Sequence, residues 1–300
     1  MDVWQIIDTH LMAPAPLKTR RLPTFYPSSA STRSEEDGKT IGACVRMNYY
    51  RCAGYEVSDP SSIWSQYVFA GGKIWEQWLI DQLKEAGVFL GANIKFMDLE
   101  RWISGEVDAI IRDPDTGGKV ILEMKTFYGY EAKKNLCGNR TVKPKPKDPN
   151  LLQAFLYLDQ FRDEVDTVIL MYFARDDHTR QQFTIKRETI DGRTYPRVIT
   201  EWNGSTYEYV DKRITLEGIY ARYEELKDHL SRQELPAPDF KHALTDAEVE
   251  EQWEAGEISK TAYEKWQRNK EANPIGHFMC QKYCDYRSTC KAHKLERGEN

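Results

Sequence analysis

Long apolar runs are missing from this chain of 300 residues. A helix needs about 18 or more predominantly apolar residues to cross a bilayer, and no stretch of the sequence approaches that length. The first residues, Met1-Asp2-Val3-Trp4, also lack the basic and then apolar layout of a secretion signal. We therefore expect a cytoplasmic protein that has no membrane partner.

An excess of positive charge is missing as well. The formal net charge of -5 at pH 7 does not indicate a nucleic-acid partner, although a local basic groove can supply phosphate contacts in an acidic protein. Two glycine-lysine segments, 71–74 and 117–120, lack the Gly-x4-Gly-Lys-Ser/Thr spacing of a phosphate-binding loop. The sequence therefore has no motif of an ATP-driven motor.

A second closely spaced pair of cysteines, which a structural zinc site usually takes together with a first pair, is missing too. Three cysteines, Cys280, Cys284 and Cys290, nevertheless lie within one short stretch. In a reducing compartment such a group favours metal ligation over disulfides. A fourth ligand must come from far away; Cys44 lies 236 residues before Cys280 (280 − 44), and Cys52 is the alternative. We expect Cys137 to be a free thiol.

Apolar residues make up 40% of the chain, which is enough for a hydrophobic core. Their periodicity predicts helices where they recur every three or four residues and strands where they form short runs. The predicted helices are 41–55, 61–86, 151–161 and 216–230, and the predicted strands are 94–99, 106–111, 119–127, 167–173 and 181–186. This order favours an α/β protein with a mixed central sheet flanked by helices.

Both ends of the chain differ from this middle part in composition. We expect a poorly structured N-terminal segment over residues 1–40 and an acidic helical insertion over 241–272. The insertion begins with a capping box, Thr245-x-x-Glu248, and its negative charge argues against a DNA contact. The main domain would then comprise residues 41–240 together with 273–300.

Asp108, Glu123 and Lys125 form the most informative local pattern. Glu123 and Lys125 leave the same face of a strand, and the turn-forming segment 113–118 can fold back to bring Asp108 beside them. Buried charges are costly unless they pair or bind a metal. Carboxylates can hold Mg²⁺ on a substrate phosphate while a lysine orients the attacking water. The alternative is a surface salt-bridge cluster on an edge strand.

Two further motifs accompany this pattern, and they complete a set of four in a fixed order. The four are Gly72-x3-Glu76 in a helix, Gly105-x2-Asp108 in a strand, Glu123-x-Lys125 in a strand and Gln153-x3-Tyr157 in a helix. This ordered set resembles the RecB-type branch of the PD-(D/E)xK nucleases. The similarity covers about residues 41–173 and 278–291.

The resemblance implies a restriction-endonuclease-like fold and a role for each motif residue. Asp108 and Glu123 would bind Mg²⁺ or Mn²⁺, and Lys125 would position the nucleophile. Glu76 would contribute to the same site; many relatives carry histidine there, so the choice between the two ions stays open. Gln153 and Tyr157 would help to hold the lysine, the DNA and the metal-bound waters.

The cysteines are similar to those of the iron–sulfur members of this family. These members include CRISPR-adaptation nucleases, the AddB nuclease domain and phage-encoded and eukaryotic relatives, which place one cysteine before the nuclease motifs and three after them. The resemblance implies a [4Fe–4S] cluster on Cys44, Cys280, Cys284 and Cys290 that closes the domain through a C-terminal segment. Cys280 and Cys284 are one residue further apart than is usual, and zinc in place of the cluster is the alternative.

Residues 131–150 are rich in positive charge and contain three prolines. We expect an extended loop that follows a phosphate backbone; the alternative is a solvated, mobile loop. The DNA-binding residues would be Lys133, Lys134, Arg140, Lys143, Lys145 and Lys147. Phe127, Tyr128 and Tyr130 either stack on unpaired bases or form a core cluster at the end of the strand.

Together these patterns predict a metal-dependent DNA nuclease, with single-stranded DNA ends as the substrate and exonuclease action. One alternative is a DNA-end-binding subunit of a CRISPR-adaptation, recombination or phage replication complex with little activity of its own. Another is a restriction enzyme that cuts duplex DNA at one sequence.

Overall fold

The computed structural model describes residues 3–13 and 24–297, with side chains described as far as residue 294. The chain forms two compact units, each built from two separate segments. The first unit comprises Met1–Ala43 and Ser62–Asp228, and the second comprises Cys44–Ser61 and His229–Asn300. These boundaries differ from the predicted ones, because the acidic helices and the C-terminal cysteines belong to one unit that is separate from the sheet.

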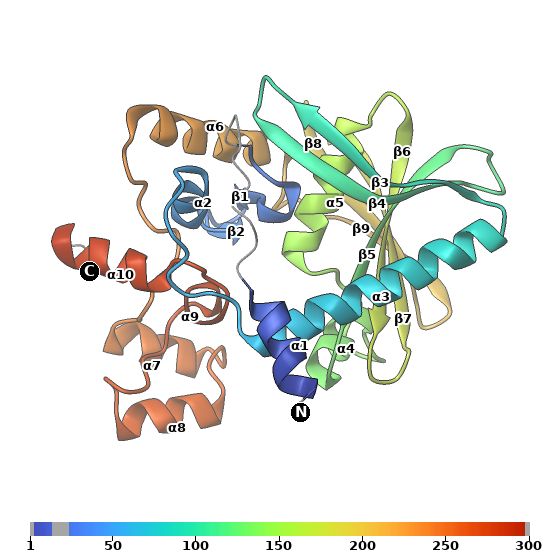
Figure 1. Ribbon diagram of the computed structural model, residues 1–300. Coiled ribbons are helices and arrows are strands. Elements are labelled where there is room, and N and C mark those ends of the chain that lie inside the picture. The colour runs from blue at the N-terminus through green and yellow to red at the C-terminus, as the bar shows by residue number, and fades with distance from the viewer. Residues whose placement is uncertain (1–2, 14–23, 298–300) are drawn as a thin grey trace. The chain divides into compact units, whose positions relative to one another are not determined.

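A seven-stranded sheet forms the centre of the first unit (Figure 1). The strands follow one another across the sheet in chain order, and the only parallel pair among the described strands is β5 with β6. The strands are β3 (Phe89–Asp98), β4 (Ile103–Arg112), β5 (Lys119–Phe127), β6 (Val165–Ala174), β7 (Arg180–Ile190), β8 (Arg193–Trp202) and β9 (Ser205–Val210). The prediction of an α/β protein with a mixed central sheet is confirmed.

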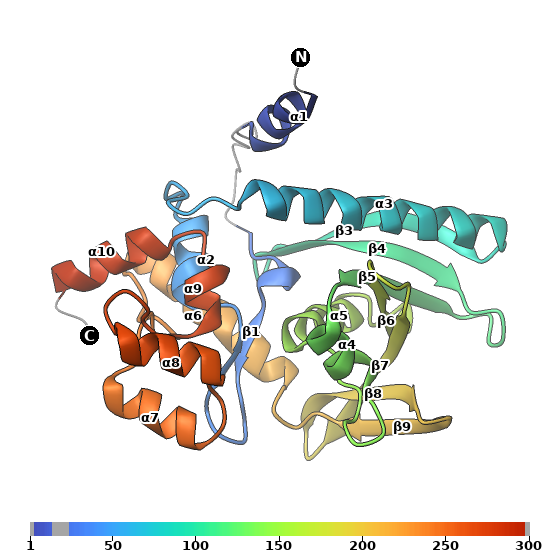
Figure 2. The same ribbon diagram turned by 90° about the horizontal axis from the view of Figure 1, so that it is seen from below.

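Two long helices lie against this sheet. Helix α3 (Ile63–Glu85) packs over β3, β4 and β5, and helix α5 (Asp148–Gln160) packs over β5, β6 and β7 on the other side (Figure 2). Every residue of α5 from Leu151 to Leu158 is buried. Helix α3 differs, since Ile80 is its one fully buried residue. The unit also contains α1 (Val3–Met12), α4 (Tyr130–Cys137) and most of α6 (Leu216–Arg232), whose last residues, from His229 on, belong to the second unit.

The N-terminal part of the chain is more ordered than predicted. Residues 3–12 form α1, and two short strands, β1 (Ser31–Arg33) and β2 (Thr40–Gly42), pair after the short 3-10 helix η1 (Pro27–Ser29). Phe25 and Thr32 are buried. Gly42 permits the close packing, since a Cβ atom there would lie 2.3 Å from the carbonyl oxygen of Ala30. Residues 1–2 and 14–23 of the predicted weak segment lie outside the described residues.

The second unit is helical. Its helices are α2 (Val45–Cys52), α7 (Asp246–Glu254), α8 (Lys260–Arg268), α9 (Phe278–Lys282) and α10 (Arg287–Arg297). The predicted capping box at Thr245 begins α7. Val249, Ile258 and Trp266 form a small core of their own, which explains why the acidic helices fold as a pair. Across the described residues of both units, none of the helices is long and apolar enough to cross a membrane.

Candidate active site and cysteine cluster

The site in the first unit forms where strands β4 and β5 separate. They pair only from Ala109–Leu122 to Arg112–Lys119, whereas β5 continues to pair with β6 as far as Phe127. Beyond Leu122, β5 therefore lacks a backbone partner on its β4 side. The predicted hairpin is confirmed, and Asp108 lies at the point of divergence, next to the last paired residue of β4.

The side chain of Asp108 bridges the two diverging strands. Its Oδ2 atom accepts a hydrogen bond of 2.6 Å from the backbone N–H of Met124, a donor that would otherwise have no strand partner. Burial raises the pKa of Asp108, against the opposing effects of the Lys125 charge and of this hydrogen bond. The divergence thus fixes one carboxylate beside the next residues of β5.

Glu123 and Lys125 lie on the same face of β5, as the strand periodicity predicts. The Glu123 side chain is fully buried, and its Oε1 atom accepts a hydrogen bond from the Lys125 ammonium group. Burial raises the pKa of Glu123 to about 8, although the charge of Lys125 opposes the shift. The pKa of Lys125 is raised despite its own burial, because Glu123 and Asp108 favour its charged form.

Glu76 approaches this group from helix α3. Its half-buried carboxyl group has a raised pKa, caused first by burial and then by the charge of Asp108, and lowered in turn by Lys125. The charges of Asp108 and Lys125 thus both act on the Glu76 carboxyl group. Glu76 and Lys125 also line the same groove. The structure therefore brings together Glu76, Asp108, Glu123 and Lys125 from three elements.

Gln153 and Tyr157 lie on the face of α5 that packs against the sheet. The amide Nε2 of Gln153 donates to the Tyr157 hydroxyl group at 2.8 Å, and that hydroxyl donates to the carbonyl oxygen of Glu106 at 2.9 Å. Burial raises the pKa of Tyr157, and the charge of Glu123 adds to the shift. The pair thus lies beside the buried carboxyl group and ties α5 to β4, two residues before Asp108.

One oxygen atom of Glu123 indicates whether the site suits a divalent ion. Its Oε2 atom is buried and has no hydrogen-bond partner in the described part of the chain. An unpaired buried carboxylate oxygen is costly, and binding a cation removes that cost. The three carboxyl groups are the oxygen ligands that Mg²⁺ and Mn²⁺ take. The residues present fit such an ion in chemical type.

The second unit brings the four predicted cysteines to one cavity. Cys44 at the start of α2 and Cys280, Cys284 and Cys290 near the C-terminus all line it, whereas Cys52 is not among its described lining residues. Burial raises the pKa of Cys44 and of Cys280 to about 12, and for Cys280 the other three thiols add to the shift. This arrangement favours Cys44 over Cys52 as the fourth member of the group.

His242 lines the same cavity and was not singled out from the sequence. Both of its ring nitrogens are buried without a hydrogen-bond partner among the described residues. Burial lowers the pKa of His242 to about 4, so the ring is neutral. Four thiols and an unpaired imidazole fit a metal group in chemical type. A lone histidine between Phe240 and Leu244 carries no sequence signal that would reveal its place in this cavity.

The side chains of the carboxylate site and of the cysteine cavity would have to adjust around a bound metal. In the part of the chain that the structure describes, no group of three or more His, Cys, Asp or Glu side chains is arranged to hold a metal ion as it stands. Thiols must also lose their protons before they bind a metal. The donor types fit, and the final ligand geometry would form on binding.

The basic segment is not one extended loop as predicted. Its first part is helix α4, and its second part folds back so that the N–H of Lys145 donates to the carbonyl oxygen of Asn135 at 3.0 Å. Lys133 forms an ion pair with Asp177, and Lys143 lies over the ring of Tyr207 at 4.8 Å. The helix forms because the prolines come only after Gly138. Lys134 is half-buried and Arg140 is exposed.

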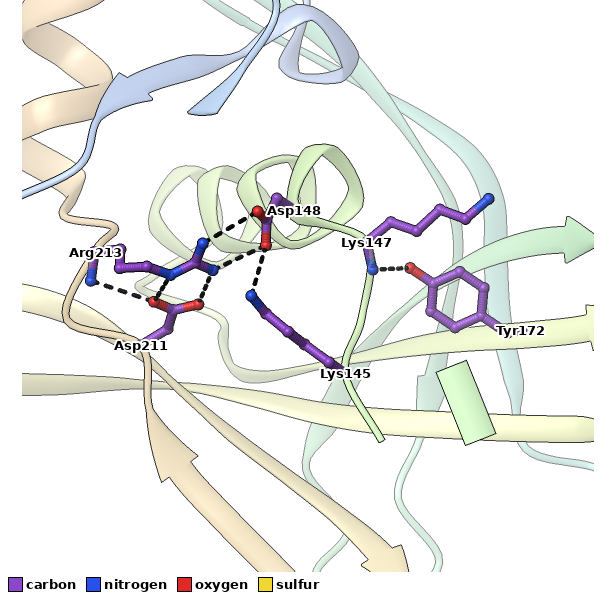
Figure 3. Close-up of polar contacts among 6 residues, drawn as sticks. All are labelled: Lys145, Lys147, Asp148, Tyr172, Asp211 and Arg213. Atoms are coloured by element: carbon purple, nitrogen blue, oxygen red, sulfur yellow. Dashed lines mark hydrogen bonds and ion pairs between the residues drawn. The ribbon is translucent and has the colours of Figure 1, made fainter. Parts of the chain in front are cut away.

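Two lysines of this segment lie at the start of α5 (Figure 3). Lys145 forms an ion pair with Asp148 at 3.3 Å, and Asp148 is bound from its other side by Arg213 at 2.9 Å. The backbone N–H of Lys147 donates to the Tyr172 hydroxyl group at 3.1 Å, while its side chain points away from this group. Part of the predicted DNA-binding charge is therefore already paired within the protein.

The three aromatic residues after Lys125 divide between the two alternatives left open by the sequence. Phe127 is buried in the core, whereas Tyr128 and Tyr130 are exposed. A different aromatic group, on α3 and β6, lies along the groove that contains Glu76 and Lys125. Periodicity predicts the helix that carries its tryptophans, but their exposure cannot be deduced from spacing alone.

Comparisons with known proteins do not assign the chain to a family. No protein-family model matches the sequence, and no curated protein matches it. Its function must therefore be argued from the site.

Proposed function

We propose that this protein is a metal-dependent DNA nuclease, and that it acts as an exonuclease on single-stranded DNA ends. The observation that carries the proposal is the buried carboxyl group of Glu123 at the divergence of β4 and β5. One of its oxygens accepts a hydrogen bond from the ammonium group of Lys125, and the other has no partner among the described residues. A buried acid with a perturbed pKa beside a lysine is typical of a catalytic site.

Asp108 and Glu123 would hold Mg²⁺ or Mn²⁺, and Glu76 would contribute directly or through water. Such an ion, when bound, neutralises phosphate charge and lowers the pKa of a bound water. Lys125, held in its charged form by Glu123 and Asp108, would orient the attacking water and offset the charge that develops on the phosphate. Gln153 and Tyr157 would hold α5 in place against β4 beside the site.

The cysteine group supports a separate proposal for the second unit. Cys44, Cys280, Cys284 and Cys290 would hold a [4Fe–4S] cluster, and His242 would supply a polar contact to it. Thiolates are the usual ligands of such clusters. Iron content of about four per chain in anaerobically purified protein would support this proposal. Stoichiometric zinc without iron would replace it by the zinc alternative.

The nuclease proposal is tested on single-stranded DNA labelled at the 5′ or the 3′ end, with Mg²⁺ or Mn²⁺ omitted or added. Wild-type protein should shorten the strands only with the metal, and Lys125→Ala should abolish cleavage. Lys119→Ala is the matched control, since Lys119 lies on the same strand and forms an exposed ion pair with Glu164. Full activity of Lys125→Ala would contradict the mechanism.

The same assay separates the alternatives. Binding of single strands without degradation would favour a DNA-end-binding subunit of a recombination, replication or CRISPR-adaptation complex. Cutting of duplex DNA at one sequence would favour a restriction enzyme.

A further inference from the structure

A groove of about 1520 Å³ runs along the sheet of the first unit, beside helix α3. Its lining includes Glu76 and Lys125, so it begins at the candidate active site. From there it extends over side chains of β6, β7 and β8 and reaches Thr206 on β9. The proposed function leaves open what this groove holds.

The alternation of side chains explains why the groove is open. On β7 and β8, Phe183, Ile185 and Val198 point to the buried face of the sheet. Gln182 and Thr184, which alternate with these residues on β7, and Ile199 and Glu201 on β8 point to the other face and line the groove. A strand buried on one face and polar on the other is typical of an antiparallel sheet with one solvated side. The floor of the groove is thus rich in amide, hydroxyl and carboxylate groups.

The wall of the groove is aromatic. Trp75 lies 4.4 Å from the ring centroid of Phe173 and 5.7 Å from that of Trp78, and His178 completes the group at 5.8 Å from Trp75. Trp78 is 47% exposed, and Phe69, one further lining residue, is 56% exposed. Large exposed aromatic rings along a groove mark a binding surface rather than a core.

The charges in the groove suit a polyanion only in part. Lys73, Lys125 and Arg180 line it, against the carboxyl groups of Glu76 and Glu201. A duplex is bound chiefly through many phosphate contacts, and three basic side chains beside two acidic ones do not provide them. An unpaired strand gains a large share of its binding from bases that stack on aromatic rings, with a few cations on the backbone.

We infer that this groove binds a single strand of nucleic acid, whose unpaired bases stack on Trp78 and Phe69 while its backbone leads to Lys125. The inference rests on the proposed function for the direction of the strand, because the active-site residues line the same groove. It adds the residues that would select unpaired strands. The partly buried rings of Trp75 and Phe173 pack against the exposed ring of Trp78, with centroids 5.7 Å and 6.5 Å away.

The test measures binding of a labelled 12-nucleotide DNA strand by fluorescence anisotropy with metal omitted, so that cleavage does not interfere. Trp78→Ala and Phe69→Ala should each weaken binding about fivefold or more, the loss expected for one stacked base. Trp64→Ala should change binding less than about twofold. Trp64 is the matched control, because it lies on the same helix and is 75% exposed but does not line the groove.

An abasic strand of the same length separates stacking from general attraction. It should bind wild-type protein more weakly than the normal strand, and Trp78→Ala should weaken its binding no further. A duplex of the same sequence should also bind more weakly than the single strand. Equal binding of the normal and abasic strands, or equal losses for Trp78→Ala and Trp64→Ala, would overturn the inference.

The outcome is distinguishable from that of the proposed function. If Trp78→Ala weakens binding but neither wild-type protein nor any variant cleaves DNA, the groove binds single strands and the nuclease proposal fails. If wild-type protein cleaves DNA and Trp78→Ala binds as well as wild type, the nuclease proposal stands and the groove inference fails. Absence of single-strand binding by wild-type protein overturns the inference directly.

Discussion

The proton on Glu123 links the site to pH. Burial raises the pKa of this carboxyl group to about 8, which favours its protonated form in the metal-free protein near neutral pH. A divalent ion binds the charged form, and its binding should therefore release about one proton at pH 7. Affinity for the ion should rise as the pH is raised to about 8 and level off above it.

Titration calorimetry with Mn²⁺ in two buffers of different ionisation enthalpy measures this release. The observed heats should differ between the buffers at pH 7 and agree at a pH well above 8. Glu123→Gln serves as the control, because it removes the proton and weakens binding. Equal heats in both buffers at pH 7 would show that Glu123 is already charged or does not bind the ion.

The hydroxyl group of Tyr157 offers a second prediction at this scale. Tyr157→Phe removes the partner of Gln153 and of the Glu106 carbonyl group, and Gln153 is only 7% exposed. Leaving a buried amide unpaired should lower the free energy of unfolding by about 1–3 kcal/mol, measured in urea. Tyr128→Phe, at a residue that is 68% exposed, should change it by less than about 0.5 kcal/mol.

At the scale of elements, the start of α5 depends on a network of charges (Figure 3). Arg213 binds Asp211 at 2.7 Å and Asp148 at 2.9 Å, and Asp148 also favours the positive end of the helix dipole. Asp211 is only 5% exposed. Arg213→Ala should therefore lower the free energy of unfolding by about 2–4 kcal/mol near neutral pH, because it leaves the buried Asp211 carboxylate without a charged partner.

The effect of Arg213→Ala should depend on pH with a definite sign. Burial alone would raise the pKa of Asp148, but the hydrogen bond from Arg213 and the charge of Lys145 hold it below its usual value of 3.8. The stabilisation is present above that value and is lost as the pH falls through the lower pKa of the folded protein. The difference between wild type and variant, measured in urea, should shrink below about pH 4.

Arg197→Ala is the control for this network. Arg197 forms ion pairs with Glu188 and Glu208, and all three side chains are more than a third exposed. Exposed pairs contribute about 0–1 kcal/mol. An equal loss for Arg197→Ala and Arg213→Ala would contradict the role of the buried Asp211.

Elements with a strong local signal could be predicted from the sequence. The strand of Glu123, its hairpin partner and the helix of Gln153 are where periodicity and turn residues placed them. Helix α3 was also predicted, but its exposure was not. Periodicity shows that Trp64 and Trp78 share a helix with other apolar residues; it does not show how much of that helix the sheet covers.

Features that depend on distant segments could be predicted only in part. Cys44 was chosen as a partner for the C-terminal cysteines because of a resemblance, and the structure places all four at one cavity. His242 in that cavity was not predicted, since no motif surrounds it. The assignment of the acidic helices to the same unit was missed because it depends on a small core around Trp266 rather than on their charge.

At the scale of the whole molecule, the cysteine group would join segments that lie far apart in the chain. Cys44 is the N-cap residue of α2, whereas the other three thiols belong to the C-terminal part of the same unit. A bound metal group closes a long loop and stabilises the folded state over the unfolded one. Cys44→Ser should therefore lower the iron content and the unfolding temperature of the second unit together.

Two other cysteines provide controls for this last prediction. Cys52→Ser changes a thiol on the same helix, α2, and Cys137→Ser changes one in the first unit. Iron content by elemental analysis and unfolding by calorimetry should match wild type in both variants. If Cys52→Ser loses the iron and Cys44→Ser keeps it, the ligand assignment is wrong. If neither variant changes the metal content, neither Cys44 nor Cys52 is a ligand, and the candidate for the fourth ligand becomes His242, whose buried ring nitrogens have no partner among the described residues.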